Sequence, residues 1–498
     1  MESEPATFHR VWRHGARRGG APHAGALNRG PLQGGATPRR AFLRGALAAG
    51  AAASLPFTRA WPAAPGLNRR SASASRLPTP TLAQLRWQEA ELGMFFHFDL
   101  EVFTRAAGRH VPPGQHIPAS IFDPAHLDTD QWLAVARSLG ARYAVFTAKH
   151  DTGFLMWPSD AYPYGVKQAP WRHGRGDVVG SFIASCHRAG IAPGLYCSGG
   201  TNAYLGETAW RFPGVSASAR AHRLALIEQV YRELWSRYGP LAYMYFDGGL
   251  LPPEQGGPHL LPLLRRWQPN MVCFQGPPDA PGGLARWIGD EGGFAPYPCW
   301  CTAASDDANA EPGAGDPSGR YWIPAEADVP LRFHHWMWRP DDAQDILSLP
   351  ALTEMYFATV GRGTNLILNA NIGPDGRVPA PDARRLAQFG ARLRQWFAAP
   401  LAGGAGRGDV TTLRLPAPRP VNCILIEEDV AFGQRVRDYV LEGHVAGEWQ
   451  PLEAGQSIGR KRLQRIPELP LSAIRLRVRH AAAPPVIRRL AAYHLPAE

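Results

Sequence analysis

The chain has 498 residues, of which 45% are hydrophobic, and a formal net charge of +11. No uninterrupted apolar run approaches the roughly 20 residues of a membrane helix, so we expect no stable membrane insertion. The charge is unevenly placed: residues 1–70 hold eleven arginines against Glu2 and Glu4, which leaves about +2 for the other 428 residues. A body this close to neutral has no charge pattern for a polyanion, and we expect no nucleic-acid partner.

The basic N-terminal segment reads as an export leader. Arg39 and Arg40 precede Phe42-Leu43 and a short, Ala-rich apolar stretch from Gly45 to Pro56. This order resembles a bacterial twin-arginine signal, which predicts a periplasmic or secreted protein. We expect residues 1–75 to form a disordered leader carrying this signal. The alternative is a disordered Arg/Gly/Ala tail without a targeting role.

Between residues 80 and 400, apolar strands alternate with amphipathic helices. A helix begins at Asp128 or Thr129 and ends at Gly140, a second runs from Asp177 to Gly190, and a long third spans about 219–238. This rhythm predicts a catalytic domain with a (β/α)8-like TIM barrel. No Gly-x-Gly-x-x-Gly turn follows the first strand, which argues against a dinucleotide fold. The expected strands are Leu92–Asp99, Arg142–His150, Ile191–Ser198, Leu241–Asp247, Met271–Phe274, Arg286–Gly289 and Asn365–Ile372.

After Leu401 the alternation of strand and helix patterns ends. Residues 403–408 (Gly-Gly-Ala-Gly-Arg-Gly) are expected to be a linker. Short segments separated by turn residues then predict a small β-sandwich accessory domain over 401–498, whose role is left open between sugar binding and packing. The expected strands are Thr411–Leu415, Asn422–Glu427, Tyr439–Val445 and Ala473–Val478.

Two carboxylates follow predicted strands and precede glycines. Asp247 precedes Gly248-Gly249, and Glu291 precedes another glycine pair and lies among aromatic residues. Carboxyls at one barrel mouth can hydrolyse a glycosidic bond, and a separation of about 5–5.5 Å gives retention. A loop or helix cap for Asp247 and a loop salt bridge for Glu291 are the structural alternatives. Position alone does not separate Glu291 from Asp290.

His97 and His150 each close an apolar run at a strand end. Histidines at one mouth can hydrogen-bond sugar hydroxyls, although a single histidine there is more often a core residue. A metal site would need Asp99 or Asp151 as a third ligand, and the spacing matches no known motif. The six cysteines likewise fit no zinc or disulfide framework, so we expect buried or loop thiols, with a disulfide after export as the alternative. We therefore predict no metal and no cofactor.

A series of ordered motifs over about 85–398 resembles the family 29 glycoside hydrolases, the α-L-fucosidases. The matching stretches include Gly93-Met94-Phe95-Phe96-His97-Phe98, Thr147-Ala148-Lys149-His150, Gly176-Asp177-Val178-Val179, Gly194-Leu195-Tyr196, Phe246-Asp247-Gly248, Trp287-Ile288-Gly289-Asp290-Glu291, Pro324-Ala325-Glu326-Ala327-Asp328-Val329 and Gly361-Arg362-Gly363. The resemblance implies a retaining exo-α-L-fucosidase whose partner is a fucosylated oligosaccharide or glycoconjugate.

The resemblance also implies the role of each candidate residue. Asp247 matches the catalytic nucleophile, and Glu291 matches the acid/base of the branch selective for α-1,3/1,4-linked fucose, which usually reads Trp-x-Gly-Asn-Glu. The residues that match or neighbour substrate-binding positions are His97, His150, Asp151, Tyr196 and Trp336.

Departures from the family pattern fall around the expected sugar. The family usually reads Lys-His-His-Asp-Gly-Phe where this chain has Lys149-His150-Asp151-Thr152-Gly153-Phe154. After the first strand, His-Phe-Gly becomes His97-Phe98-Asp99, and a basic, Pro-rich loop over Arg105–Pro118 replaces the usual Glu-Trp-Gly segment. A glycosidase for another sugar, such as an α-L-galactoside, and a non-catalytic glycan-binding protein are therefore the alternatives. The retained carboxylates favour hydrolysis.

Overall fold

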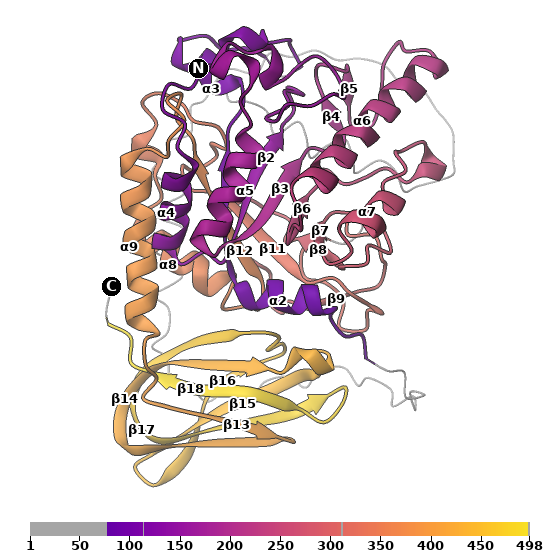
Figure 1. The fold of residues 1–498 in the computed structure, drawn as a ribbon. Helices are drawn as coiled ribbons and strands as arrows, with labels where there is room; N and C mark the ends of the chain where they lie inside the picture. Colours follow the sequence, from indigo (N-terminus) through magenta and orange to yellow (C-terminus); the bar gives the residue numbers. More distant parts are fainter. Residues whose placement is uncertain (1–76, 113, 310–311, 497–498) are drawn as a thin grey trace, which may run out of the picture. The chain divides into compact units, whose positions relative to one another are not determined.

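A closed barrel of eight parallel strands forms the centre of the structure (Figure 1). The computed structural model describes residues 77–112, 114–309 and 312–496, so the predicted leader over 1–75 lies outside the described residues. Around the barrel the strand order is β1-β12-β11-β8-β7-β6-β3-β2, which confirms the predicted fold. The strands are β1 Leu92–His97, β2 Tyr143–Lys149, β3 Ala192–Cys197, β6 Tyr243–Tyr245, β7 Val272–Phe274, β8 Leu284–Trp287, β11 Ala325–Pro330 and β12 Asn365–Asn371.

Helices pack around the outside of the barrel, and their ends follow the caps read from the sequence. The Asp128 carboxylate accepts a hydrogen bond from the backbone of α4, which ends at the left-handed Gly140, and Asp177 and Gly190 do the same for α5. These caps satisfy backbone groups that a helix end leaves unpaired. The helices are α2 Leu82–Ala90, α3 Glu101–Ala106, α4 Thr129–Leu139, α5 Val178–Ala189, α6 Ala217–Arg237, α7 Leu261–Trp267, α8 Leu349–Ala358 and α9 Ala380–Trp396.

The barrel departs from a regular strand–helix alternation in its second half. No helix occurs in the β7–β8 connection at 275–283, nor in the described residues between β8 and β11, where the short strands β9 Thr302–Ala303 and β10 Tyr321–Trp322 pair. Another short pair, β4 Thr201–Asn202 and β5 Glu207–Thr208, follows β3. Strand β11 had been seen in the sequence only as a motif, because Glu326 and Asp328 interrupt its apolar pattern.

Aromatic side chains fill the interior of the barrel. Trp87 of α2 stacks on Tyr243, with 5.7 Å between the ring centroids. The Glu326 carboxylate is fully buried and accepts hydrogen bonds from the hydroxyls of Tyr143 and Tyr243. Burial raises the pKa of Glu326 to about 7, and the two tyrosine hydrogen bonds oppose that shift. Both oxygens of the Glu326 carboxylate therefore have hydrogen-bond donors, as a buried polar group requires.

A separate six-stranded antiparallel sheet follows the barrel in the chain. Its order is β13-β18-β14-β17-β15-β16, and it has a hydrophobic core of its own. The strands are β13 Ala402–Arg407, β14 Val410–Glu428, β15 Val436–Val445, β16 Glu448–Gly455, β17 Arg462–Ala481 and β18 Val486–Tyr493. The predicted strands lie within β14, β15 and β17.

The prediction of a linker at 403–408 was wrong. Residues 403–407 belong to edge strand β13, which pairs with β18 and carries a register shift between Gly404 and Gly406. Gly406 serves close packing, because a Cβ on it would lie 2.2 Å from Oγ1 of Thr411. Gly-rich sequence can mark such a close approach in a strand as well as a flexible connection.

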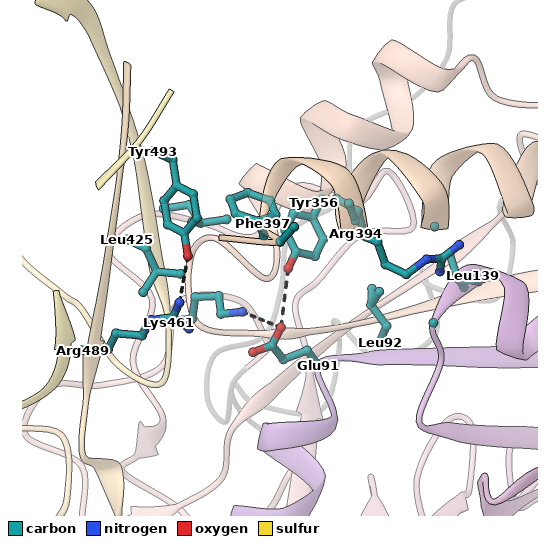
Figure 2. Close-up of a pocket in the computed structure, with 15 residues that line it drawn as sticks. Glu91, Leu92, Leu139, Tyr356, Arg394, Phe397, Leu425, Lys461, Arg489 and Tyr493 are labelled. Atoms are coloured by element: carbon teal, nitrogen blue, oxygen red, sulfur yellow. Dashed lines mark hydrogen bonds and ion pairs between the residues drawn. The ribbon is translucent and has the colours of Figure 1, made fainter. Parts of the chain in front are cut away.

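Charged contacts join the sheet to residues at the start of β1. Figure 2 shows the Lys461 ammonium and the Tyr356 hydroxyl at the Glu91 carboxylate, where the Lys461 contact is 2.6 Å. Arg460 binds the other oxygen of Glu91 at 2.9 Å. These cations hold the pKa of Glu91 below its usual value although burial acts in the opposite direction. The β1 end of the barrel opposite the candidate site is therefore tied to the sheet by ion pairs.

Candidate active site

The candidate residues gather at the carboxyl ends of the barrel strands. His97 is the last residue of β1, His150 directly follows β2, Tyr196 lies near the end of β3, and Asp247 comes two residues after β6. Trp336 lies in the loop that follows β11. Parallel strands present their carboxyl ends on one face of a barrel, where such enzymes carry out their chemistry.

Asp247 sits on a tightly turned backbone. Its φ is 43°, and Gly248 and Gly249 follow with φ of 71° and 78°. Left-handed backbone is unfavourable for a non-glycine residue, and such strain concentrates at functional sites. The hydroxyl of Tyr196 donates a 2.7 Å hydrogen bond to Oδ2 of Asp247. The turn therefore places the carboxylate at the barrel mouth, and Tyr196 fixes its direction.

Opposing influences act on the Asp247 carboxyl. The residue keeps surface in contact with solvent, yet its carboxyl group is closely surrounded by protein. Burial raises the pKa of Asp247, and the negative charges of Asp151 and Glu291 raise it further. The Tyr196 hydrogen bond and the charge of His150 lower it. Asp151, which replaces the usual second histidine, thus brings an additional negative charge to the site.

Rings of His97, His150, Tyr196 and Trp336 form a contiguous cluster beside Asp247. The His150 ring is stacked on Tyr196 at 5.3 Å, and the His97 centroid lies 4.9 Å from that of Trp336 and 5.5 Å from that of His150. Nδ1 of His97 is hydrogen-bonded to Oδ1 of Asn369 at 2.8 Å. Burial, followed by the charge of His150, lowers the pKa of His97 well below its usual value. His97 is therefore a neutral ring in a fixed orientation.

The loop that carries Trp336 is anchored from both sides. Asn369 of β12 donates a 2.9 Å hydrogen bond to the backbone carbonyl of Trp336. Arg332, which is buried, forms ion pairs with Asp382 of α9 and with Asp342 of the same loop. A buried guanidinium needs such paired carboxylates to offset its desolvation. The ion pairs of Arg332 therefore hold the start of the loop, and the hydrogen bond from Asn369 holds it at Trp336.

Glu291 and Asp290 are adjacent in the chain, but their side chains have different neighbours. Oδ1 of Asp290 accepts a 2.7 Å hydrogen bond from the amide of Gly292, so this exposed side chain shapes its own turn. Asparagine could accept the same bond, which explains why aspartate is tolerated here. The charge of Glu291 raises the pKa of both Asp247 and Asp328. Glu291 therefore lies close enough to Asp247 for its charge to act there, whereas Asp290 bonds its own turn.

Asp328 is a buried carboxyl of the site, and in the sequence it stands out only as part of the Pro324–Val329 motif. It accepts hydrogen bonds from Tyr245 at 3.0 Å and from the Trp287 indole at 2.5 Å. Burial raises the pKa of Asp328 well above its usual value, and Glu291 contributes in the same direction. An acidic residue inside an otherwise apolar strand, two positions after Glu326, was the available signal. Its bond to Trp287 links the barrel interior to the segment that leads to Glu291.

Metal clusters, disulfides and membrane-spanning helices are absent from the described residues. Within 77–112, 114–309 and 312–496, no group of three or more His, Cys, Asp or Glu side chains has an arrangement suited to a metal ion. All six cysteines fall in these ranges and are buried free thiols. No helix in the described part of the chain has the length and apolar character needed to cross a bilayer.

Comparisons with known proteins agree on one family. Residues 115–396 match the sequence model of the family described as Alpha-L-fucosidase. The chain is 30% identical over 470 residues to Alpha-L-fucosidase 1 of Arabidopsis thaliana, which covers 84% of this chain and 88% of the plant protein. A crystal structure from Bacteroides thetaiotaomicron, described as an α-L-fucosidase, matches with a TM-score of 0.80 and 37% identity over 84% of this chain and 100% of its own. A glycoside hydrolase 29 family member from a rumen bacterium has a TM-score of 0.73 and 29% identity, covering 85% of this chain and 78% of that one.

Proposed function

The chain belongs to the α-L-fucosidase family, glycoside hydrolase family 29, and we propose that it acts by retention with Asp247 as nucleophile and Glu291 as acid/base. The observation that carries this proposal is the pairing of Asp247 with Tyr196 at a barrel mouth also reached by the charge of Glu291. Two carboxyls at one mouth supply both functions that a double displacement requires.

The mechanism follows from the two carboxyls. Ionised Asp247 attacks the anomeric carbon, while Glu291 donates its proton to the departing glycosidic oxygen. The bond to the leaving group breaks as a fucosyl ester of Asp247 forms. Glu291 then takes a proton from a water molecule that attacks the anomeric carbon, which releases fucose with its original configuration. Tyr196 and His150 favour the ionised form of Asp247 that the first step needs.

Replacement of the nucleophile tests this assignment. Asp247→Gly should lower turnover by roughly 10³-fold or more, because the glycosyl ester cannot form. Azide should partly restore turnover of 4-nitrophenyl α-L-fucoside, because a small anion can occupy the space of the missing side chain. Near-normal activity in the variant would contradict the assignment.

The acid/base assignment has a matched control in the neighbouring residue. Glu291→Ala should impair substrates with poor leaving groups far more than activated aryl fucosides, because only the former need a proton in the first step. Asp290→Ala, which removes the adjacent exposed carboxylate, should show no such dependence on the leaving group. Equal losses for all leaving groups in Glu291→Ala would count against the acid role.

We further propose selectivity for terminal α-1,3- and α-1,4-linked fucose. The support is the Trp287–Glu291 segment, which resembles that branch of the family, together with the location of Glu291. Purified enzyme incubated with α-1,2-, α-1,3-, α-1,4- and α-1,6-fucosylated oligosaccharides should release fucose from the second and third only. Preferential cleavage of the α-1,2 or α-1,6 linkage would refute this selectivity.

The altered residues around the sugar give a second candidate, an enzyme that accepts a related sugar. The charge of Asp151 acts directly on Asp247, where the family pattern has a histidine. Rates on 4-nitrophenyl α-L-fucoside and α-L-galactoside decide between the sugars, and faster cleavage of the galactoside would favour this second candidate. Binding of fucosylated glycans without cleavage would instead indicate a glycan-binding protein.

The proposed route to the substrate is export through the twin-arginine pathway. The support is the Arg39-Arg40 pair with its apolar sequel in the leader. A folded fluorescent reporter fused behind residues 1–75 should reach the periplasm of a bacterial host. Substitution of both arginines by lysine should retain it in the cytoplasm, and unchanged export of that variant would refute the assignment.

A further inference from the structure

Asp99 is a fully buried carboxylate beside the candidate site to which the mechanism above gives no role. It lies two residues after the end of β1 and is 1% exposed. The backbone amide of Leu100 donates to its Oδ1 at 2.6 Å, and Oγ1 of Thr152 lies 2.7 Å from both of its oxygens. Burial of a carboxylate carries a large desolvation cost, and these donors offset only part of it. A residue that costs stability at a barrel mouth invites a functional explanation.

The side chain that faces Asp99 from β2 is His150. Its Nδ1 lies 3.9 Å from Oδ2 of Asp99, within the range of a charge pair but too far for a hydrogen bond. This nitrogen is buried and has no hydrogen-bond partner among the described residues. The two nitrogens of an imidazole flank one carbon, and their N–H or lone-pair directions diverge. With Nδ1 toward Asp99, Nε2 therefore faces away from that carboxylate.

The His150 ring also connects Asp99 to the nucleophile. One face of the imidazole is stacked on Tyr196 with an interplanar angle of 14°, and Tyr196 donates to Asp247. Asp99, His150, Tyr196 and Asp247 thus form a continuous series of contacts from a buried carboxylate to the barrel mouth. A change in the orientation of His150 would therefore alter its contact with the sugar and, through Tyr196, the position of Asp247.

The charges around Asp99 allow it to act on His150 near neutral pH. Burial raises the pKa of Asp99 to about 6, and Glu101 of α3 also raises it. His150 of β2, the Thr152 hydroxyl and the Leu100 amide lower it. Tyr164 is a further titratable group beside Asp99, and burial, followed by the charge of Asp99, raises its pKa. Above pH 6 the carboxylate form therefore predominates.

We propose that Asp99 is a positioning residue that, with Thr152, fixes the His150 imidazole with a proton on Nδ1, so that Nε2 is directed at a hydroxyl of the bound fucosyl ring. This inference rests on the proposed function of the site. Both positions 99 and 152 depart from the family pattern, and in this chain they are in direct contact. The carboxylate that faces His150 in this chain therefore comes from the end of the first strand.

A double-mutant cycle tests the proposal, with the affinity for L-fucose and the rate on 4-nitrophenyl α-L-fucoside as readouts. Asp99→Asn keeps the shape and the acceptor oxygen for Leu100 but removes the charge. It should weaken L-fucose binding by about 10-fold, the size of one hydrogen bond to a charged group. His150→Gln should cost at least as much. The double variant should bind no more weakly than His150→Gln, because Asp99 acts only through that ring.

Controls separate positioning from folding. Asp130→Asn, a change of the same type at an exposed site on α4, should leave binding and rate unchanged. If Asp99→Asn shows no cooperative unfolding transition, Thr152→Val takes its place in the cycle, because it removes the hydroxyl that holds both carboxylate oxygens. The same absence of additivity with His150→Gln is expected for it.

Each outcome has one meaning. Additive losses of binding in the double variant, or wild-type affinity in Asp99→Asn, would overturn the positioning role while the proposed function stands. Suppose that the variants lose fucose binding non-additively, but that the wild-type protein cleaves neither aryl fucosides nor fucosylated oligosaccharides. This result would support the positioning role and refute the proposed function. Absence of fucose binding in the wild type would overturn both.

Discussion

Asp99→Asn should stabilise the protein at neutral pH while it impairs the site. In the folded state burial raises the pKa of Asp99 to about 6 from the ordinary 3.8. The folded protein therefore binds this proton more tightly than the unfolded chain does. Stability from this group is fully present below about pH 4 and is lost as the pH rises through 6. Two pKa units correspond to about 3 kcal/mol, which is the upper limit of the destabilisation by ionised Asp99.

Because asparagine resembles protonated aspartate in shape and never ionises, the variant should exceed the wild type by no more than about 1 kcal/mol near pH 4.5 and by up to about 3 kcal/mol at pH 7.5. Urea unfolding of both proteins at pH 4.5, 6.0 and 7.5, followed by tryptophan fluorescence, measures the difference directly. Asp130→Asn controls for the general effect of losing one negative charge. A variant that is less stable than the wild type at pH 7.5 would show that Asp99 is a structural anchor and would refute the reasoning.

Three further predictions follow from individual contacts. Tyr196→Phe removes the hydrogen bond that lowers the pKa of Asp247, so the acidic limb of the pH profile of kcat/KM should move to higher pH and activity should fall about 10-fold; an unchanged limb would contradict the link. Tyr243→Phe leaves buried Glu326 with one tyrosine donor and should lower the free energy of unfolding by about 1–3 kcal/mol, measured with urea; a neutral effect would argue against this bond. Gly406→Val should lower the melting temperature because its Cβ would overlap Thr411, whereas Gly404→Ala, which meets only an ordinary contact, should not; equal effects would argue against the β13 packing.

Sequence signals that act over a few residues predicted most of the helices and strands of the barrel. The helices that begin after Asp128 and Asp177 and end at Gly140 and Gly190 were predicted because caps act over a few residues. Strand β11 was not predicted as a strand, because Glu326 and Asp328 break its apolar run and are satisfied only by distant tyrosines and a tryptophan. The error over 403–408 has the same origin. The strand character of this segment comes from its pairing with β18, which lies about 80 residues further along the chain.

The sequence indicated candidate residues for the site, but it did not show how their side chains contact one another. Strand ends indicated His97, His150 and Asp247, and motif resemblance singled out Glu291 over Asp290. Sequence alone did not show that Asp290 bonds its own turn, because that depends on the amide of Gly292. Nor did it show the contact of Asp99 with Thr152, which joins residues 53 positions apart in the chain. Such contacts arise from the closure of the barrel, which a local pattern does not contain.

The central claim, that Asp247 becomes covalently bonded to the sugar, is tested most directly by trapping the ester. An activated 2-fluoro-2-deoxy-α-L-fucosyl fluoride should inactivate the enzyme with time, because the fluorine slows hydrolysis of the ester more than its formation is slowed. Peptide mass spectrometry of the inactivated protein should then find the fluorofucosyl group on Asp247, and excess L-fucose should protect against labelling. A label on Glu291 or Asp328, or turnover with inversion and no trapped ester, would contradict the account.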